Sequence, residues 1–164
     1  MSKLSPEQVD TSLRQLEALE SEAEMDGLLD EFGEHQAFLL ALLMEYGEED
    51  FNEDEQEIVL FHGIALWRCL KDGGLIQRAV TEEDLQKVEA ESLHIIEETE
   101  REGLEHFLNF FQEIVPDHPQ PELMKYILEE ISTEEAEWIR TKNIPTMMAF
   151  LSLVLSALLV QSAT

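Results

Sequence analysis

The sequence predicts an all-α protein, a compact bundle of about six to seven helices. Good helix formers, above all Leu, Glu, Ala, Met and Gln, dominate the chain. Seven Gly and five Pro in 164 residues are too few for the many turns of a β-sandwich or barrel. Apolar residues recur at helical spacing, and no segment alternates as a strand does. Since 44% of the residues are apolar, we expect residues 1–164 to bury one core and form a single all-helical domain.

Helix boundaries are marked by local signals. Ser5 and Gln8 match a capping box, in which a side chain at each end satisfies a backbone N–H. Val9, Leu13 and Leu16 then continue at helical spacing. The same reasoning predicts helices over about 34–46, 52–70, 82–113, 122–131 and 146–161, and a short helix capped at Ser132. The helix over about 82–113 is expected to be long and continuous, with Gly103 as a kink.

Charge is large and uneven along the chain. The formal net charge is −27, from 37 acidic and 10 basic residues. Residues 1–57 and 81–115 are strongly acidic, residues 58–80 have a net charge of +2, and residues 143–164 carry no charge. Such a surface repels nucleic acid and anionic membranes, so we expect no direct nucleic-acid binding.

Two stretches of the chain resemble each other, at residues 34–70 and 118–161. Each contains an amphipathic helix, an acidic helix start and an apolar helix, in that order. We therefore predict an internal repeat of two similar helix pairs, bridged by the long helix over about 82–113.

The final apolar segment, residues 144–160, has three interpretations. A core helix, a self-association surface and a membrane anchor all fit a run of 17 residues without charge. The anchor is disfavoured because a spanning helix needs about 20 apolar residues, and Pro145, Ser152 and Ser156 interrupt this run. The polar N-terminus, without an apolar stretch, and a single cysteine lead us to expect a cytoplasmic protein.

Metal and catalytic motifs are sparse, so we predict no catalytic residues and no cofactor. Glu91 and His94 have the spacing of one half of a carboxylate-bridged di-iron site, but the second half is missing. His62 lies within an apolar helix and is the third weak metal candidate, although a core histidine is the better interpretation. Residues 50–54 resemble the start of a calcium loop, but a helix cap explains them better. Cys69 is interpreted as a small buried residue.

Two tryptophans are the candidate interaction residues. Trp67 and Trp138 are of the residue type favoured at binding hot spots, although packing in a helical core is the commoner role. Arg68 and Arg140 are next or near to them in sequence and suggest cation–π stacking.

The leading functional hypothesis is a non-enzymatic acidic module for protein–protein interaction, of an adaptor, immunity-like or chaperone-like kind. Its partner is expected to be a basic protein, since opposite charge accelerates association. The alternatives are a structural homo-oligomer that self-associates through apolar helices, a nucleic-acid mimic and a metal-dependent helical enzyme.

Overall fold

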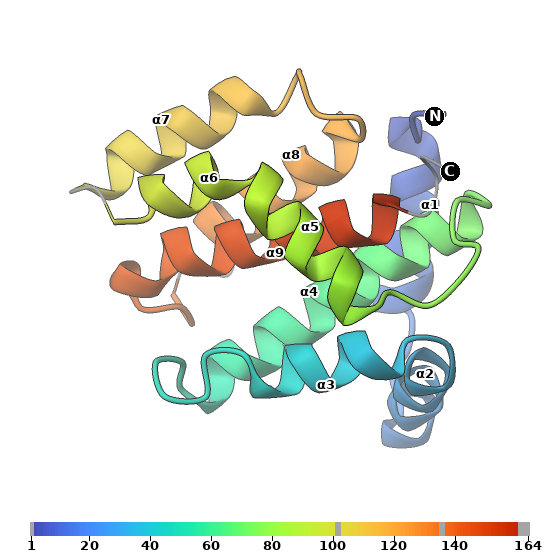
Figure 1. The fold of residues 1–164 in the computed structure, drawn as a ribbon. Coiled ribbons are helices and arrows are strands. Elements are labelled where there is room, and N and C mark those ends of the chain that lie inside the picture. The colour runs from blue at the N-terminus through green and yellow to red at the C-terminus, as the bar shows by residue number, and fades with distance from the viewer. Residues whose placement is uncertain (1, 101–102, 135–136, 161–164) are drawn as a thin grey trace.

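The computed structural model describes residues 2–100, 103–134 and 137–160. Within these ranges the chain forms nine α-helices and no strand, which confirms the predicted all-helical fold (Figure 1). The helices are α1 Pro6–Glu17, α2 Glu22–His35, α3 Ala37–Glu45, α4 Glu53–Asp72, α5 Glu82–Glu91, α6 Leu93–Glu98, α7 Leu104–Ile114, α8 Pro121–Glu129 and α9 Ile144–Leu159. A π-helical turn, Glu130–Glu134, follows α8, and a 3-10 turn, Thr141–Asn143, precedes α9.

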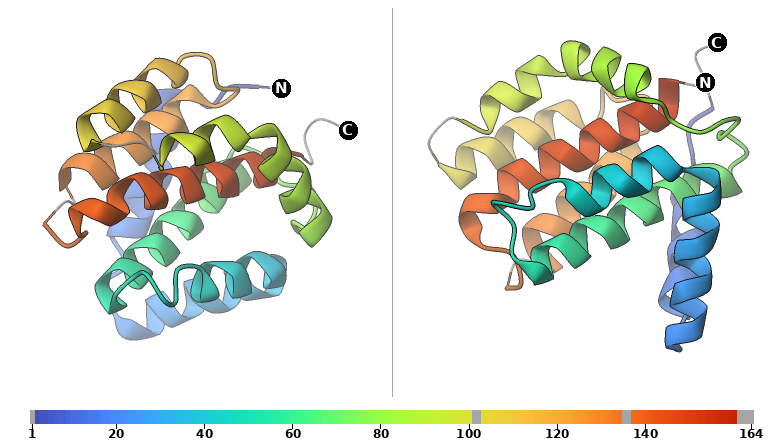
Figure 2. Two further views of the ribbon diagram at one scale, coloured as in Figure 1. Left: turned by 60° about the vertical axis from the view of Figure 1, so that its left-hand side comes forward. Right: turned by 60° about the horizontal axis from the view of Figure 1, so that its bottom comes forward.

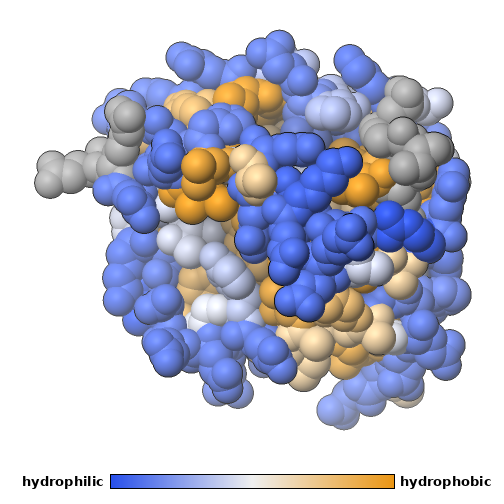
Figure 3. Space-filling model, viewed as in Figure 1, coloured by the Kyte–Doolittle hydropathy of each residue, from blue (hydrophilic) through white to orange (hydrophobic). Residues whose placement is uncertain are grey.

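Two apolar helices, α4 and α9, pack against each other at the centre of the bundle (Figures 1 and 2). Helix α4 also contacts α1 and α3, while α9 contacts α5, α6, α7 and α8. Hydrophilic residues cover most of the face seen in Figure 3 and leave separate apolar patches between them. The charge pattern agrees with this arrangement, because α9 carries no charge and most of its residues are buried, whereas the acidic residues of the surrounding helices mostly face solvent.

Three helix starts use the local signals expected from the sequence. Ser5 and Gln8 form the capping box of α1, and Asn52 and Glu55 form that of α4. Thr81 caps α5 in the same way. The helix cap predicted instead of a calcium loop at residues 50–54 is thus present in the structure.

The prediction of one long helix over about 82–113 is wrong, because this region contains three helices, α5, α6 and α7. Ser92 ends α5 with a backbone conformation outside the helical region, at φ −106° and ψ 17°. Gly103, the residue directly before α7, has φ +94°, a conformation that glycine adopts readily and that a continuous helix excludes. Two local breaks therefore replace the single kink that we expected at Gly103.

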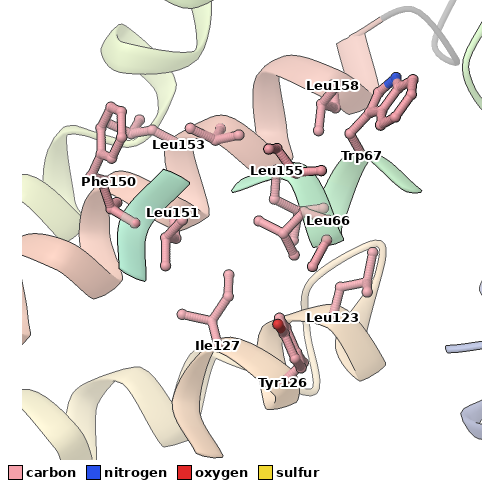
Figure 4. Close-up of a cluster of buried hydrophobic side chains, with 14 of the residues drawn as sticks. Leu66, Trp67, Leu123, Tyr126, Ile127, Phe150, Leu151, Leu153, Leu155 and Leu158 are labelled. Carbon is pink, nitrogen blue, oxygen red and sulfur yellow. The ribbon is translucent and has the colours of Figure 1, made fainter. Parts of the chain in front are cut away.

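The final apolar helix, α9, is a core helix in this structure. The stretch Thr141–Leu159 is long and apolar enough to cross a membrane by length and composition, but 78% of that window is buried inside the protein. Figure 4 shows Leu151, Leu155 and Leu158 of α9 in one cluster with Leu66 of α4 and Leu123 of α8. Most of α9 is thus buried against its neighbouring helices in this structure.

Two buried glutamines fasten extended segments to the bundle. Gln36 immediately precedes α3, and its side chain donates to the Arg78 carbonyl at 3.3 Å and accepts from the Val80 N–H at 2.8 Å. Gln120 precedes α8 and makes the matching pair of bonds, with the Ser2 carbonyl at 2.8 Å and the Leu4 N–H at 2.9 Å.

The two segments that these glutamines bind, residues 78–80 and residues 2–4, lead directly into α5 and α1. Helices α3 and α8 each pack on a central helix, α4 and α9 respectively. The predicted repeat over 34–70 and 118–161 corresponds to these two helix pairs. The duplication stays a prediction, and the matched glutamines support it.

Candidate functional site

The candidate site is built around Glu55, a buried carboxylate in the first turn of α4. Glu55 accepts hydrogen bonds from the Arg140 backbone N–H at 2.8 Å and from the Arg140 side chain at 2.8 and 3.1 Å. Asn143, in the turn before α9, donates to the same carboxylate at 3.1 and 3.2 Å. Burial raises the pKa of Glu55, but the hydrogen bonds from Arg140, Asn52 and Asn143 outweigh it, so the net pKa is lowered.

This carboxylate fixes the turn that carries Trp138. Arg140 also donates to the Asp50 carbonyl at 2.5 Å, and Ile139 is buried with 3% exposure. Trp138 directly precedes these two anchored residues, yet its side chain is 56% exposed. The anchored neighbours therefore hold a large aromatic side chain at the surface.

Trp138 lines a pocket of about 340 Å³ against the outer face of α4. The other lining residues are Asp54, Glu57, Ile58, Phe61 and His62. Because Glu55 points inward, Asp54 and Glu57 lie on the exposed part of the helix. The pocket therefore combines two aromatic residues, one aliphatic residue and two carboxylates, a set that favours a cationic side chain with an apolar stem.

His62 lies at the buried side of this pocket. Its Nδ1 is 2.5 Å from the Tyr126 hydroxyl of α8, and its ring is 2% exposed. Burial lowers the pKa of His62 to about 4, so the imidazole is neutral at pH 7. His62 links α4 to α8 through Tyr126. Because its imidazole is neutral, the charged groups that line the pocket are the carboxylates of Asp54 and Glu57.

The weak metal candidates are not brought together. Glu91 is exposed at the end of α5, whereas His94 is exposed on α6, where its ring lies 6.2 Å from that of Phe110. His62 is buried in α4. Among the described residues, no group of three or more His, Cys, Asp or Glu side chains has a geometry that could hold a metal ion.

The two tryptophans predicted as interaction residues have different environments. Trp67 is fully buried, with its ring 5.2 Å from that of Phe32, whereas Trp138 is exposed. Arg68 and Arg140, whose positions suggested stacking on these rings, form ion pairs with Asp72 and Glu55. Lys71 lies over the Trp67 ring, with its ammonium 5.1 Å from the ring centroid.

Cys69 is the small buried residue that the sequence suggested. Its side chain is 2% exposed on α4. Burial, and then the charge of Asp72, raises the pKa of the thiol to about 12. The thiol is therefore protonated at neutral pH and a poor nucleophile.

No family model, curated protein or solved structure matches this chain. The sequence drew attention to Trp138, but it gave no sign that Phe61, Asp54 and Glu57 would surround the same pocket.

Proposed function

We propose that this protein is a non-enzymatic acidic interaction module that binds a basic protein partner at the Trp138 pocket. The observation that carries the proposal is the exposed Trp138, set beside Phe61 and two carboxylates by a turn that is itself anchored. A preorganised aromatic side chain at the surface costs little further ordering on binding.

The chemistry of the pocket supports a lysine or arginine side chain as the group that enters it. The cationic head meets Asp54 and Glu57, and its methylene stem packs on the rings of Trp138 and Phe61. Aromatic residues at the centre of an interface commonly carry much of its binding energy.

The net charge of −27 supports the same kind of partner. An acidic field attracts a basic protein over long distances and accelerates its association, while the pocket supplies a local point of contact. The long-range contribution weakens as salt is added, because mobile ions screen exposed charges beyond about 10 Å at 0.1 M ionic strength.

A capture experiment tests this proposal. The immobilised protein is exposed to lysate at low salt, and bound proteins are released by added salt and identified by mass spectrometry. The parallel variants are Trp138→Ala and Leu93→Ala, since Leu93 is matched in exposure, at 54% against 56%.

We expect the parent protein and Leu93→Ala to retain the same basic protein, and Trp138→Ala to lose it. A partner that stays bound in high salt, or that binds Trp138→Ala as well as the parent, would overturn the proposal.

A further inference from the structure

Helix α3 is apolar on every side, although one of its sides is exposed to solvent. Residues 37–44 contain no polar side chain. Leu39 and Leu43 are fully buried, whereas Ala37, Ala41 and Met44 are exposed, Met44 to 56%. In Figure 3 apolar side chains gather at the place that α3 occupies in Figure 1. A helix that is apolar all round is normally buried, so this exposed side of α3 is unusual for the surface of a monomer.

The exposed side, which we call the α3 face, consists of Ala37, Ala41 and Met44. These residues follow one another at steps of four and three, so they lie in one row along the helix. The side chains of Ala37 and Ala41 are small, and this lets a second helix approach closely. Met44 is flexible and adapts its shape to a partner. The partly exposed Phe38 and Leu40 border the row, so its shape suits a helix laid along α3.

The residues around the α3 face are acidic. Glu34 precedes α3 and Glu45 ends it, and both are exposed. Residues 15–67, which include α2, α3 and the loop after α3, contain no Lys or Arg. Burial, and then the charges of Asp50 and of Glu89 on α5, raise the pKa of Tyr46, which places both carboxylates near the end of α3. A partner that covers the α3 face therefore meets negative charge at its edges.

We propose that the α3 face binds an amphipathic helix of a basic protein. Large apolar side chains of that helix, at helical spacing, pack over Ala37 and Ala41, and the lysines or arginines beside them meet Glu34 and Glu45. A second copy of this chain, or an anionic lipid surface, would instead bring negative charge against these carboxylates.

The α3 face and the Trp138 pocket lie on opposite sides of α4. Gly63 of α4 faces Leu43 of α3, whereas Asp54 of α4 lines the Trp138 pocket. These two positions on α4 are roughly two and a half helical turns apart, so their side chains point in opposite directions. The two binding surfaces can therefore be tested separately, and either can fail without the other.

Fluorescence anisotropy with two labelled peptides tests the proposal. The first is an end-blocked helix of about 18 residues of Leu and Lys, with its leucines at helical spacing on one side. The second has the same composition, but its leucines are spread around the helix. At about 0.15 M salt, which screens the general attraction between opposite charges, the first peptide should bind saturably and at least about tenfold more tightly than the second.

Matched variants locate the binding. Ala41→Lys adds bulk and positive charge to the α3 face, keeps a good helix former there and should weaken binding of the first peptide at least about tenfold. Ala23→Lys adds the same charge at an exposed position near the start of α2, a helix that extends away from α3 in Figure 2, and should leave binding unchanged. Trp138→Ala should also leave it unchanged.

Four results would each overturn the proposal. They are equal binding of the two peptides, equal binding by Ala41→Lys and Ala23→Lys, loss of binding in Trp138→Ala, and a dimer of the free protein that Ala41→Lys dissociates in sedimentation velocity. The last result would show that a second copy of the chain covers the α3 face.

Discussion

Gln36 and Gln120 lie 84 positions apart in the chain and make the same two hydrogen bonds. Each is fully buried, donates to one backbone carbonyl and accepts from the N–H two residues further on. Gln36, before α3, thus holds residues 78–80, which lead into α5. Gln120, before α8, holds residues 2–4, which lead into α1. Each bound segment is therefore fastened to a helix pair that is distant in the sequence.

Replacing either glutamine with alanine should destabilise the fold to a similar extent. Gln36→Ala and Gln120→Ala each leave one buried backbone N–H, that of Val80 or of Leu4, without its acceptor, which costs about 1–3 kcal/mol. Urea unfolding measures this, with the exposed Gln15→Ala as the control. A large loss in one variant and none in the other would show that the two clamps are not equivalent.

Replacing Glu55 with glutamine should lower stability by about 2–4 kcal/mol, because it removes the buried charge that Arg140 and Asn143 surround. Glu53→Gln, two positions earlier in the same helical turn, changes the same charge at an exposed position and should have little effect. Thermal and urea unfolding of both variants would check this. Equal stability of the two variants contradicts the role given to Glu55.

Two glycine-to-alanine substitutions should change the free energy of unfolding in opposite directions. A Cβ at Gly63 would lie 2.6 Å from Cδ1 of Leu43, so Gly63→Ala should cost about 1–3 kcal/mol through overpacking of α3 on α4. A Cβ at Gly27 meets no atom within 4 Å, and Gly27→Ala should stabilise α2 by up to about 1 kcal/mol. Denaturant midpoints of the two variants decide whether this close contact is real.

Acidification should weaken the fold through His62. Its ordinary pKa is 6.5, and burial lowers it to about 4 in the folded protein. The unfolded chain therefore takes up a proton at higher pH than the folded chain does. The stabilisation from neutral His62 is complete above pH 6.5 and is lost as the pH falls from 6.5 to about 4, by about 3 kcal/mol in all.

The variant His62→Gln removes this titration. The stability difference between the parent and His62→Gln should shrink by about 2 kcal/mol between pH 7 and pH 5. Unfolding free energies at the two pH values provide the measurement. A difference that does not change with pH would contradict a buried neutral imidazole.

Local sequence signals predicted where helices start, whereas the roles of Glu55 and Gln36 depend on contacts with residues distant in the sequence. The boxes at Ser5 and Asn52 need only residues three apart, so they could be read from the sequence. Glu55 looked like one more residue of an acidic helix start, because its partner Arg140 is 85 positions away. Gln36 and Gln120 occupy matching positions in the two similar stretches, but the hydrogen bonds of Gln36 could not be predicted, since they depend on where residues 78–80 lie.

The candidate site was predictable only in part. Trp138 was singled out by residue type, but its exposure depends on the burial of Ile139 and the anchoring of Arg140. The pocket also needs the outer face of α4 to lie beneath that turn. Periodicity describes each helix by itself and cannot supply this contact.

We propose that one pocket, rather than the acidic surface as a whole, receives a basic side chain. Titration of ¹⁵N-labelled protein with an end-blocked pentapeptide of alternating glycine and arginine tests it directly. We expect saturable shifts confined to the Trp138 indole and to the amides around Asp54, Glu57 and Phe61. Shifts spread equally over the acidic residues 17–34 and 82–100, with Trp138 unmoved, would contradict it.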